Sequence, residues 1–397
     1  MTGSVDELLQ VGVSHTEAPL DLLERLALRA DAVPGLLADI SALGTTEAVL
    51  LSTCSRTEIY ARAPVDPERL IEVLARQAGV ASTTVRAVSR LRVGASAVEH
   101  LLRVTAGLES RLVGEVDIQR QVRTAHRAAR AAGTLGPLLD RVFPLALRCG
   151  DEVRSLTTLG RQGRSLARRA VDIGVAALPG AAPEVLIVGS GQMASAATER
   201  LRELGLGFRV AARDEHYAAR LAGPGNVCSL ASLEEGIRRA DLLICATSAS
   251  SPVVTFEHVQ KAMRARPRRL TLVDLAVPRN VDPAAGALEL VDLVDLSGLN
   301  DDASSDPVVR EAVLRAEELV RATARAYVAD EAARGAGPLI NAVRTQLRAT
   351  GRQDLLHRVT LTARSAAAAG DAATLLSLCE TFGVRAADVG LAPAASA

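Results

Sequence analysis

Short apolar runs alternate with amphipathic stretches along the first part of the chain. Between Glu115 and Gly133 apolar residues recur at helical spacing, and the glycine favours an end to that helix. A second helical pattern covers residues 138–148. Three further apolar runs have the length and composition of strands: 8–13, 48–51 and 58–61. Residues 1–150 are therefore predicted to form an α+β domain.

A break in the pattern at residues 176–183 separates this region from the next. Two prolines and a glycine lie within five residues there, and such a segment cannot remain helical. Beyond it, a buried-type strand at 184–188 runs into a glycine turn and a helical stretch at 195–204. Further short apolar runs follow, separated by helical or loop segments: 208–212, 227–230, 242–246, 270–275 and 290–296. Strands alternating with helices predict a doubly wound parallel sheet.

The last part of the chain, from about residue 305, shows no strand pattern. It is typical of long helices, for instance over 308–333 and 339–349. The apolar positions are mostly Ala, Leu and Val, so a helical hairpin of this kind buries little surface by itself. We expect these helices to pack against a second subunit and form a homodimer, and a cap on the same chain is the alternative.

Composition narrows the class of protein. The 397 residues include 46 basic and 46 acidic side chains, so no overall positive charge points to a nucleic-acid or membrane partner. The five cysteines are scattered without paired spacing, so we predict no disulfide framework and no metal site. The sequence has neither a signal-peptide pattern nor a run near the roughly 20 apolar residues of a membrane span. We expect a cytoplasmic protein with free thiols.

Cys54 is the candidate nucleophile. It ends an apolar run and is followed at once by polar and charged residues, where a thiol is both held rigidly and reached by a substrate. The thiolate is the reactive form, and a nearby cation such as Arg56 raises the thiolate fraction. The alternative is a small buried hydrophobic side chain at the end of a strand.

The glycine turn after the strand at 184–188 has the spacing of a dinucleotide-binding motif. It reads G-x-G-x-x-A between a predicted strand and a predicted helix, so that helix N-terminal amides receive the phosphates. At the end of the next strand, Arg213 precedes Asp214 and favours NADPH through the 2′-phosphate, whereas the aspartate would favour NAD. A domain of this fold without a cofactor is the alternative. The predicted cofactor-binding residues are Gly189, Ser190, Gly191, Gln192, Met193, Ala194 and Arg213.

Arginine is concentrated in the segment 111–169, which holds twelve arginines against five acidic residues. Four of them fall off the apolar stripe of the helix after Glu115 and should face outward: Arg120, Arg123, Arg127 and Arg130. Such a face is either merely solvated or binds a polyanion through its phosphates without reading bases. Aromatic residues total 2%, which argues against base stacking on single strands.

Four motifs in order give the chain a resemblance to the glutamyl-tRNA reductase family over roughly residues 8–345. The family's S-T-C-N-R-T/V-E is similar to S-T-C-S-R-T-E at 52–58, and its G-x-S-H-R/K-T-A-P resembles G-V-S-H-T-E-A-P at 12–19. A longer family pattern beginning H-L-F-x-V is similar to residues 100–122, and D-I-A-V-P-R-D-I-D-P resembles residues 274–283. Motifs of this length and order are highly specific.

The resemblance implies a two-stage reaction. Cys54 would attack the ester carbonyl of glutamyl-tRNA to give a thioester, with His100 as an acid/base or positioning group. Hydride from NADPH would then yield glutamate-1-semialdehyde, the precursor of 5-aminolevulinate and tetrapyrroles in the C5 route. Arg56 would pair with a carboxylate in forked geometry. The residues implied to bind the glutamyl group are Thr53, Ser55, Arg56, Ser110, Glu115, Val116, Asp117 and Gln121.

With this resemblance the expected fold class is α/β multidomain. An N-terminal α+β catalytic domain at 1–150 precedes a Rossmann-type NADPH domain with a leading helix at 151–300 and an all-helical dimerisation domain at 301–397. The partners implied are glutamyl-tRNA, or another aminoacyl-tRNA, and a second copy of the chain. Docking of glutamate-1-semialdehyde aminomutase, which would receive the labile aldehyde, is a further expectation.

The chain departs from the family pattern at a few positions. Ser55 replaces asparagine, Val-Asp at 116–117 replaces Pro-Gln, and Glu17 and Asp117 add negative charge. Two alternatives therefore stay open beside glutamyl-tRNA reduction. One is a relative that handles another aminoacyl group on tRNA or a carrier. The other is a tRNA- or partner-binding relative without turnover.

Overall fold

The computed structural model describes most of the chain as two compact units. The first unit comprises Met1–Ala106, Gln119–Glu152 and Ala316–Ala397, and the second comprises Gly107–Ile118 and Val153–Arg315. The described residues are 7–53, 55–62, 64–110, 113–115, 117–159, 162–178, 183–223, 225–247, 249, 251–264, 266, 268–276, 279–295 and 307–391.

The first unit is built on a four-stranded antiparallel sheet with the order β2-β3-β1-β4. All three strands expected in this region are present. β4 was not predicted, because its sequence Arg-Leu-Arg-Val is largely exposed at the edge of the sheet and shows no apolar run. The strands are β1 Leu8–Ser14, β2 Glu47–Ser52, β3 Arg56–Arg62 and β4 Arg90–Val93.

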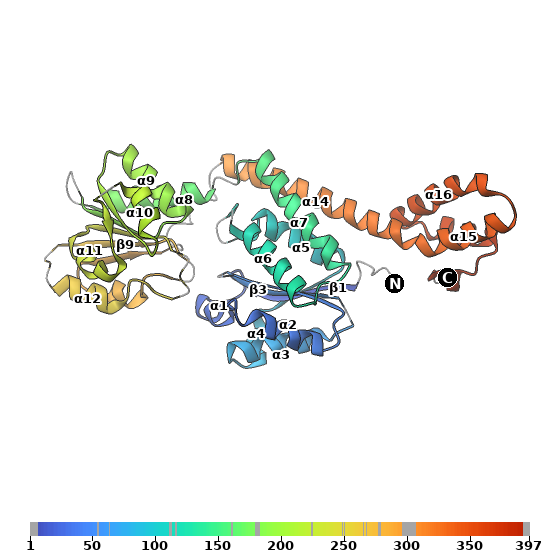
Figure 1. Cartoon of the computed structure of the whole chain (residues 1–397), viewed down its shortest axis with the longest axis horizontal. Helices are drawn as coiled ribbons and strands as arrows, with labels where there is room; N and C mark the ends of the chain where they lie inside the picture. Colours follow the sequence, from blue (N-terminus) through green and yellow to red (C-terminus); the bar gives the residue numbers. More distant parts are fainter. Residues whose placement is uncertain are drawn as a thin grey trace. The chain divides into compact units, whose positions relative to one another are not determined.

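Helices cover both faces of this sheet (Figure 1). One face carries α1 Leu20–Leu26, α2 Val33–Ala42, α3 Pro67–Ala78 and α4 Ser82–Val88. The other face carries α5 Ala95–Ala106, α6 Asp117–Ala131 and α7 Leu139–Leu156. The helical patterns expected after Glu115 and after residue 138 correspond to α6 and α7, and the first unit is therefore an α+β structure.

The second unit is built on a six-stranded parallel sheet with the order β10-β9-β8-β5-β6-β7. The chain starts at β5 in the middle, builds outward to β7, and returns to build the other half from β8. This is the doubly wound arrangement predicted from the sequence, with its switch point between β5 and β8. The strands are β5 Val185–Val188, β6 Phe208–Ala211, β7 Val227–Cys228, β8 Leu242–Cys245, β9 Leu270–Asp274 and β10 Val291–Val294.

The two faces of the parallel sheet carry separate apolar cores. The strands are buried on both faces because helices lie on each side, which explains their continuous Val, Leu and Ile runs. The helices described in this unit are α8 Gln162–Ala176, α9 Gln192–Glu203, α10 Glu215–Ala222, α11 Leu233–Arg239 and α12 Phe256–Arg264, with 3-10 turns at Leu230–Ser232 and Pro283–Ala287.

Several element boundaries differ from the sequence predictions, and three of these differences have a structural cause. The helix after the glycine turn begins at Gln192 rather than at residue 195, because it follows its N-cap Gly191 directly. β7 is shorter than expected, since Ser229 caps a 3-10 turn with its side chain. β10 begins after Leu290, which has a φ of 65° and so cannot extend the strand. Leu296, the predicted end of that strand, lies outside the described residues.

The C-terminal region is helical, as predicted. Its helices are α14 Pro307–Gly335, α15 Gly337–Ala349, α16 Leu356–Ala369 and α17 Ala372–Phe382, with 3-10 turns at Gln353–Leu355 and Ala386–Val389. Helices α15 to α17 share a small apolar core that includes Ile340 and Val343. Within the described part of the chain, no helix is both long enough and apolar enough to cross a membrane.

Helix α14 is fixed to the α+β part of the first unit by buried and half-buried ion pairs. Arg141 of α7 donates two hydrogen bonds of 2.9 Å to Glu331, in forked geometry. Arg103 of α5 lies 3.5 Å from Glu317. Glu331 is only 7% exposed, so its pair with Arg141 is the more sheltered of these contacts.

Candidate active site

The loop between β2 and β3 is held closed by Thr53. The Thr53 amide donates to the Arg56 carbonyl at 2.8 Å, and the Thr53 hydroxyl accepts from the amides of Ser55 and Arg56 at 3.1 and 3.2 Å. The Ser55 carbonyl in turn accepts from the His15 amide at 2.9 Å. Thr53 and Ser55 are thus each held by backbone hydrogen bonds. Cys54, the predicted nucleophile, lies outside the described residues.

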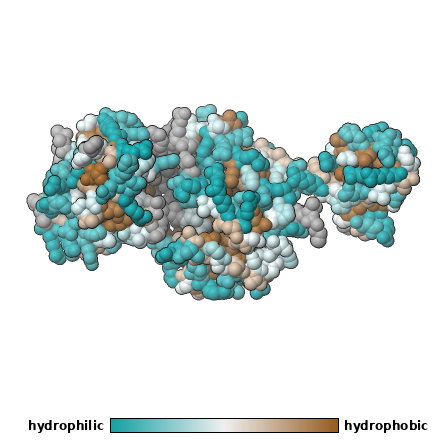
Figure 2. Space-filling model, viewed as in Figure 1, coloured by the Kyte–Doolittle hydropathy of each residue, from teal (hydrophilic) through white to brown (hydrophobic). Residues whose placement is uncertain are grey.

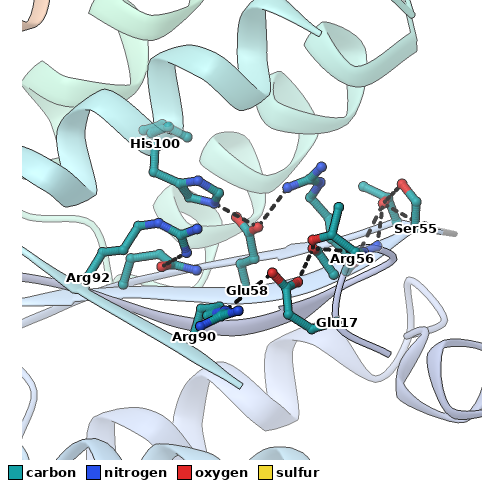
Figure 3. Close-up of polar contacts among 12 residues, drawn as sticks. Glu17, Ser55, Arg56, Glu58, Arg90, Arg92 and His100 are labelled. Carbon is teal, nitrogen blue, oxygen red and sulfur yellow. Dashed lines mark hydrogen bonds and ion pairs between the residues drawn. The ribbon is translucent and has the colours of Figure 1, made fainter. Parts of the chain in front are cut away.

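A buried polar network follows this turn on β3 (Figure 3). Glu58 is 1% exposed and lies at its centre. Its carboxylate accepts from Arg56 Nη1 at 2.8 Å and from the Tyr60 hydroxyl at 2.7 Å. His100 Nε2, on α5, lies 3.0 Å from the same carboxylate. The structure therefore brings together the predicted residues Arg56 and His100 through a carboxylate that the sequence argument did not select.

Strand geometry explains how these groups meet. Arg56, Glu58 and Tyr60 alternate along β3, so they share one face, which is the face covered by α5 and α7. Gly12 lies opposite Glu58 in the pairing of β1 with β3. A Cβ atom at Gly12 would lie 2.5 Å from the Thr57 carbonyl and 2.8 Å from Glu58 Cγ, so this strand position requires glycine.

The charges of the network determine the ionisation of Glu58. Burial alone would raise the pKa of Glu58, but the positive charges of His100 and Arg56, with hydrogen bonds from His100 and Tyr60, hold it well below its ordinary value. Burial and the neighbouring Glu58 raise the pKa of the Tyr60 hydroxyl well above its ordinary value. Glu58 is therefore an anion and Tyr60 a neutral donor across the working pH range.

A second polar group lies at the same end of the sheet (Figure 3). Glu17 accepts from the Ser14 hydroxyl at 2.5 Å and lies 3.4 Å from Arg90 Nε. Although partial burial raises the pKa of Glu17, its bonds with Ser14, Thr16 and Arg90 lower it on balance. The negative charge that distinguishes this position from the family pattern is thus offset locally by Arg90.

The remaining predicted substrate-binding residues lie between α5 and α7 along the chain. Ser110 is buried in a turn where the Gly114 amide donates to the Gly107 carbonyl at 2.9 Å. The Glu115 carbonyl accepts from Arg154 at 3.2 Å. The first turns of α6 contain Asp117, which is exposed, and Gln121, which is half-buried, whereas Val116 lies outside the described residues.

The predicted dinucleotide turn has the backbone that a phosphate site needs. Gly189 has a φ of 125°, and a Cβ there would lie 2.2 Å from the Ala246 carbonyl oxygen. Gly191 has open space where a Cβ would be, and as N-cap of α9 it leaves the first amides without a side-chain cap. Ala194 is fully buried against the sheet, whereas Gln192 is exposed and Ser190 and Met193 are partly exposed. These features fit a dinucleotide pyrophosphate at the helix N-terminus.

Two adjacent residues near the tip of β6, Arg213 and Asp214, bear on the choice between NADPH and NAD. Arg213 is exposed and stands two residues after the end of the strand. Asp214 is the N-cap of α10, and its carboxylate accepts from the Tyr217 amide at 3.0 Å. The aspartate therefore has a structural role that explains its presence without a ribose contact.

A buried network that the sequence argument did not select lies after β9. Asp274 accepts backbone hydrogen bonds from Ala276 at 3.0 Å and from Asn280 and Val281 at 2.8 Å each. The fully buried Asn280 side chain accepts from the Thr247 amide at 3.2 Å. Thr247 follows Ala246, which contacts Gly189. The Asn280 side chain therefore connects the segment 274–283 to the dinucleotide turn. The polar residues of that segment, Asp274 and Asn280, were the feature of the sequence from which this network could have been predicted.

Comparison with known proteins assigns the chain to a family. Residues 11–157 match the family described as "Glutamyl-tRNAGlu reductase, N-terminal domain". A glutamyl-tRNA reductase of Sorangium cellulosum is 36% identical over 368 residues, which cover 86% of this chain and 70% of that protein. The chain belongs to the glutamyl-tRNA reductase family. The predicted family, and its enzymatic class, are confirmed.

Other members of the glutamyl-tRNA reductase family match at similar identity. The protein of Halorhodospira halophila is 32% identical over 413 residues, covering 95% of this chain and 92% of that protein. A solved glutamyl-tRNA reductase from Methanopyrus kandleri is 26% identical, covers 95% of this chain and 99% of that chain, and gives a TM-score of 0.45. Residues 177–301 match the family "Shikimate / quinate 5-dehydrogenase", so the parallel sheet belongs to a nucleotide-binding domain of the nicotinamide-dependent dehydrogenase type.

Proposed function

We propose that this protein reduces glutamyl-tRNA to glutamate-1-semialdehyde with NADPH, through a thioester on Cys54. This reaction is the first step toward 5-aminolevulinate and tetrapyrroles by the C5 route. Family membership supports the reaction class. The observation that carries the proposal is the buried Arg56–Glu58–His100 network, because it fixes a cation two residues after Cys54 in the sequence and holds an imidazole against the same carboxylate.

The first stage is acyl transfer to Cys54. The Cys54 thiolate attacks the ester carbonyl of glutamyl-tRNA, the carbon–oxygen bond to the terminal ribose breaks, and the tRNA hydroxyl leaves with a proton. We assign that proton to His100. The Glu58 carboxylate accepts the Nε2 proton of His100, which leaves Nδ1 as the ring nitrogen that exchanges a proton with a reactant. Arg56, neutralised in part by Glu58, supplies positive charge that favours the thiolate.

The second stage is reduction of the thioester. NADPH held on the turn Gly189–Ala194 would supply the hydride. As the carbonyl carbon gains hydrogen, the bond to the Cys54 sulfur breaks, the thiolate takes up a proton, and the aldehyde is released. A thioester accepts hydride far more readily than a carboxylate does, which explains why acyl transfer precedes reduction.

The cofactor would lie on the turn Gly189–Ala194 and its 2′-phosphate on Arg213. Because Asp214 serves as the cap of α10, the exposed guanidinium is the group at the β6 tip that is available to a 2′-phosphate. We expect NADPH to outcompete NADH, and Arg213→Ala to narrow the difference. Equal use of the two cofactors by the wild type would contradict this assignment.

The acyl-transfer stage can be tested without the cofactor. Purified protein is incubated with glutamyl-tRNA carrying radiolabelled glutamate, and the label that remains on the protein is measured. We expect labelling of the wild type and of Cys149→Ser, a matched change at a buried cysteine, and none of Cys54→Ser. Labelled protein should release glutamate-1-semialdehyde when NADPH is added. Label that survives Cys54→Ser, or labelling by a different aminoacyl-tRNA alone, would refute the proposed reaction.

We also propose that the protein acts as a homodimer joined through its C-terminal helices, and that it hands the aldehyde to an aminomutase. The small core shared by α15, α16 and α17 gives these helices a folded surface of their own. Sedimentation velocity tests the dimer: a monomer at micromolar concentration would count against it. Co-sedimentation with purified glutamate-1-semialdehyde aminomutase tests the second contact.

A further inference from the structure

Helix α6 presents a row of arginines on its outer face. Its inner positions Ile118, Val122, Ala125 and Ala129 are buried. The arginines occupy the opposite face and are all exposed: Arg120, Arg123, Arg127 and Arg130. With a rise of 1.5 Å per residue, the row extends over about 15 Å. The surface around α6 is largely hydrophilic, as Figure 2 shows.

The row concentrates positive charge. Helix α6 contains four arginines against one aspartate, a larger excess than any other described helix carries. Arg130 pairs with Asp140 of α7. In the part of the chain that the structure describes, Arg123 and Arg127 form no ion pair with a carboxylate. Because the chain as a whole is neutral, this excess is a local feature rather than a property of the composition.

The inner face of α6 is connected to the candidate active site. His126 of α6 stacks on Phe143 of α7 with ring centroids 5.8 Å apart. Phe143 meets Tyr60 edge to face at 5.5 Å, and the Tyr60 hydroxyl donates to Glu58 at 2.7 Å. The inner side of α6 is therefore linked to the Glu58 network through Phe143 and Tyr60, and its outer side displays the arginine row.

We propose that the arginine row of α6 binds the phosphate backbone of the tRNA whose aminoacyl group reacts at Cys54. The proposal rests on the proposed function, since it names the surface that holds the substrate's RNA. Guanidinium groups suit phosphates because they donate two parallel hydrogen bonds and stay charged at all working pH values. Contacts of this kind position the RNA without reading its bases, which agrees with the shortage of aromatic side chains.

A charge-matched pair of variants tests the row. Arg123→Gln/Arg127→Gln removes two charges from α6. The control Arg69→Gln/Arg76→Gln removes two exposed arginines from α3, on the opposite face of the same sheet. Binding of glutamyl-tRNA to each protein is measured by filter retention from low to moderate salt. The α6 variant should bind about tenfold to a hundredfold more weakly, and the magnitude of its salt slope should fall by about 1.5, because each phosphate contact contributes roughly 0.7 to 0.9.

A small substrate separates RNA binding from chemistry. A glutamyl ester of a simple alcohol should acylate Cys54 equally in the wild type, the α6 variant and the control, while the KM for glutamyl-tRNA rises only in the α6 variant. If the double variant melts more than a few degrees below the wild type, Arg123→Gln and Arg127→Gln are measured singly.

Three results would overturn the inference. The first is wild-type affinity and salt slope in the α6 variants. The second is an equal loss in the α3 control, which would indicate diffuse attraction. Retention of the wild type, but not of the α6 variant, on vesicles of anionic phospholipid with unchanged tRNA binding would assign the row to a membrane surface instead. If the wild type itself binds no glutamyl-tRNA, both the proposed function and the inference are wrong. If the wild type binds it and the α6 variant binds it equally well, the inference is wrong and the proposed function is unaffected.

Discussion

Each of the two units buries a carboxylate beside its candidate chemistry, and the two carboxylates are held in different ways. Glu58 lies in the middle of β3 and faces cationic side chains, with Arg56 at 2.8 Å and His100 at 3.0 Å. Asp274 lies at the end of β9 and is held by backbone N–H groups, those of Ala276, Asn280 and Val281.

The pKa values of these carboxylates move in opposite directions. Burial raises the pKa of Asp274, and the three backbone hydrogen bonds lower it only in part. In Glu58 the same effect of burial is outweighed by the charges of His100 and Arg56. Full charges thus overcome desolvation where backbone dipoles do not. The first unit holds a fixed anion that orients Arg56 and His100, whereas in the second the carboxylate accepts backbone hydrogen bonds from residues after β9.

Glu58→Gln should have the largest effect. It leaves Arg56 and His100 buried beside a neutral amide, and breaking a buried ion pair by removing one partner costs about 3–5 kcal/mol. The free energy of unfolding, measured by urea denaturation, should fall by that amount, and acylation of Cys54 by glutamyl-tRNA should fall with it. Glu72→Gln, an exposed change on α3, is the control and should change neither quantity. A stable and active Glu58→Gln protein would remove the contrast with Asp274.

The glycines of the dinucleotide turn should differ from each other. Gly189→Ala places a Cβ 2.2 Å from the Ala246 oxygen at a φ of 125°, so the free energy of unfolding should fall by at least about 2 kcal/mol. Gly191→Ala has free space in the protein but would occupy the approach of the pyrophosphate. Its stability should stay near that of the wild type, while its affinity for NADPH, followed by nucleotide fluorescence, should fall at least tenfold. Equal behaviour of the two variants would contradict this division of roles.

Asp274→Asn should have a smaller effect than Glu58→Gln, because it leaves no charge unpaired. One carboxylate oxygen becomes an amide group that points at backbone donors, which costs about 1–3 kcal/mol. The melting temperature should fall modestly. The affinity for NADPH should weaken, since Asn280 connects this segment to Thr247 beside Gly189. Acylation of Cys54 should be unchanged. The exposed Glu257→Gln of α12 is the control.

The smallest effect is expected in the pH dependence of stability. The pKa of Glu58 is lower in the folded protein than in the unfolded chain, where a glutamate titrates near 4.3. Its contribution is therefore complete above that value and is lost as the pH falls below it, by at most about 1.4 kcal/mol per pH unit. Urea denaturation between pH 5 and pH 3 should show a steeper loss for the wild type than for Glu58→Gln. Parallel curves would mean that Glu58 is not held as an anion.

Local patterns in the sequence determined most of the architecture. Apolar runs and helical spacing predicted nearly all strands of both sheets, the doubly wound topology and the helical C-terminal region. The dinucleotide turn was also predictable, because strand, glycine turn and helix follow one another along the chain. The edge strand β4 was not predicted, because a largely exposed strand has no continuous apolar run.

The Glu58 network was decided by tertiary structure. His100 lies 42 residues from Glu58 along the chain, and only the packing of α5 on the sheet brings its ring within 3.0 Å of the carboxylate. The pairing of β1 with β3 then places Gly12 opposite Glu58, where no other residue fits. The sequence by itself determined which elements form and the family to which the chain belongs, since both depend on residues close together in order. Which charges neutralise one another depends on register and packing between distant segments, and these exist only in the folded protein.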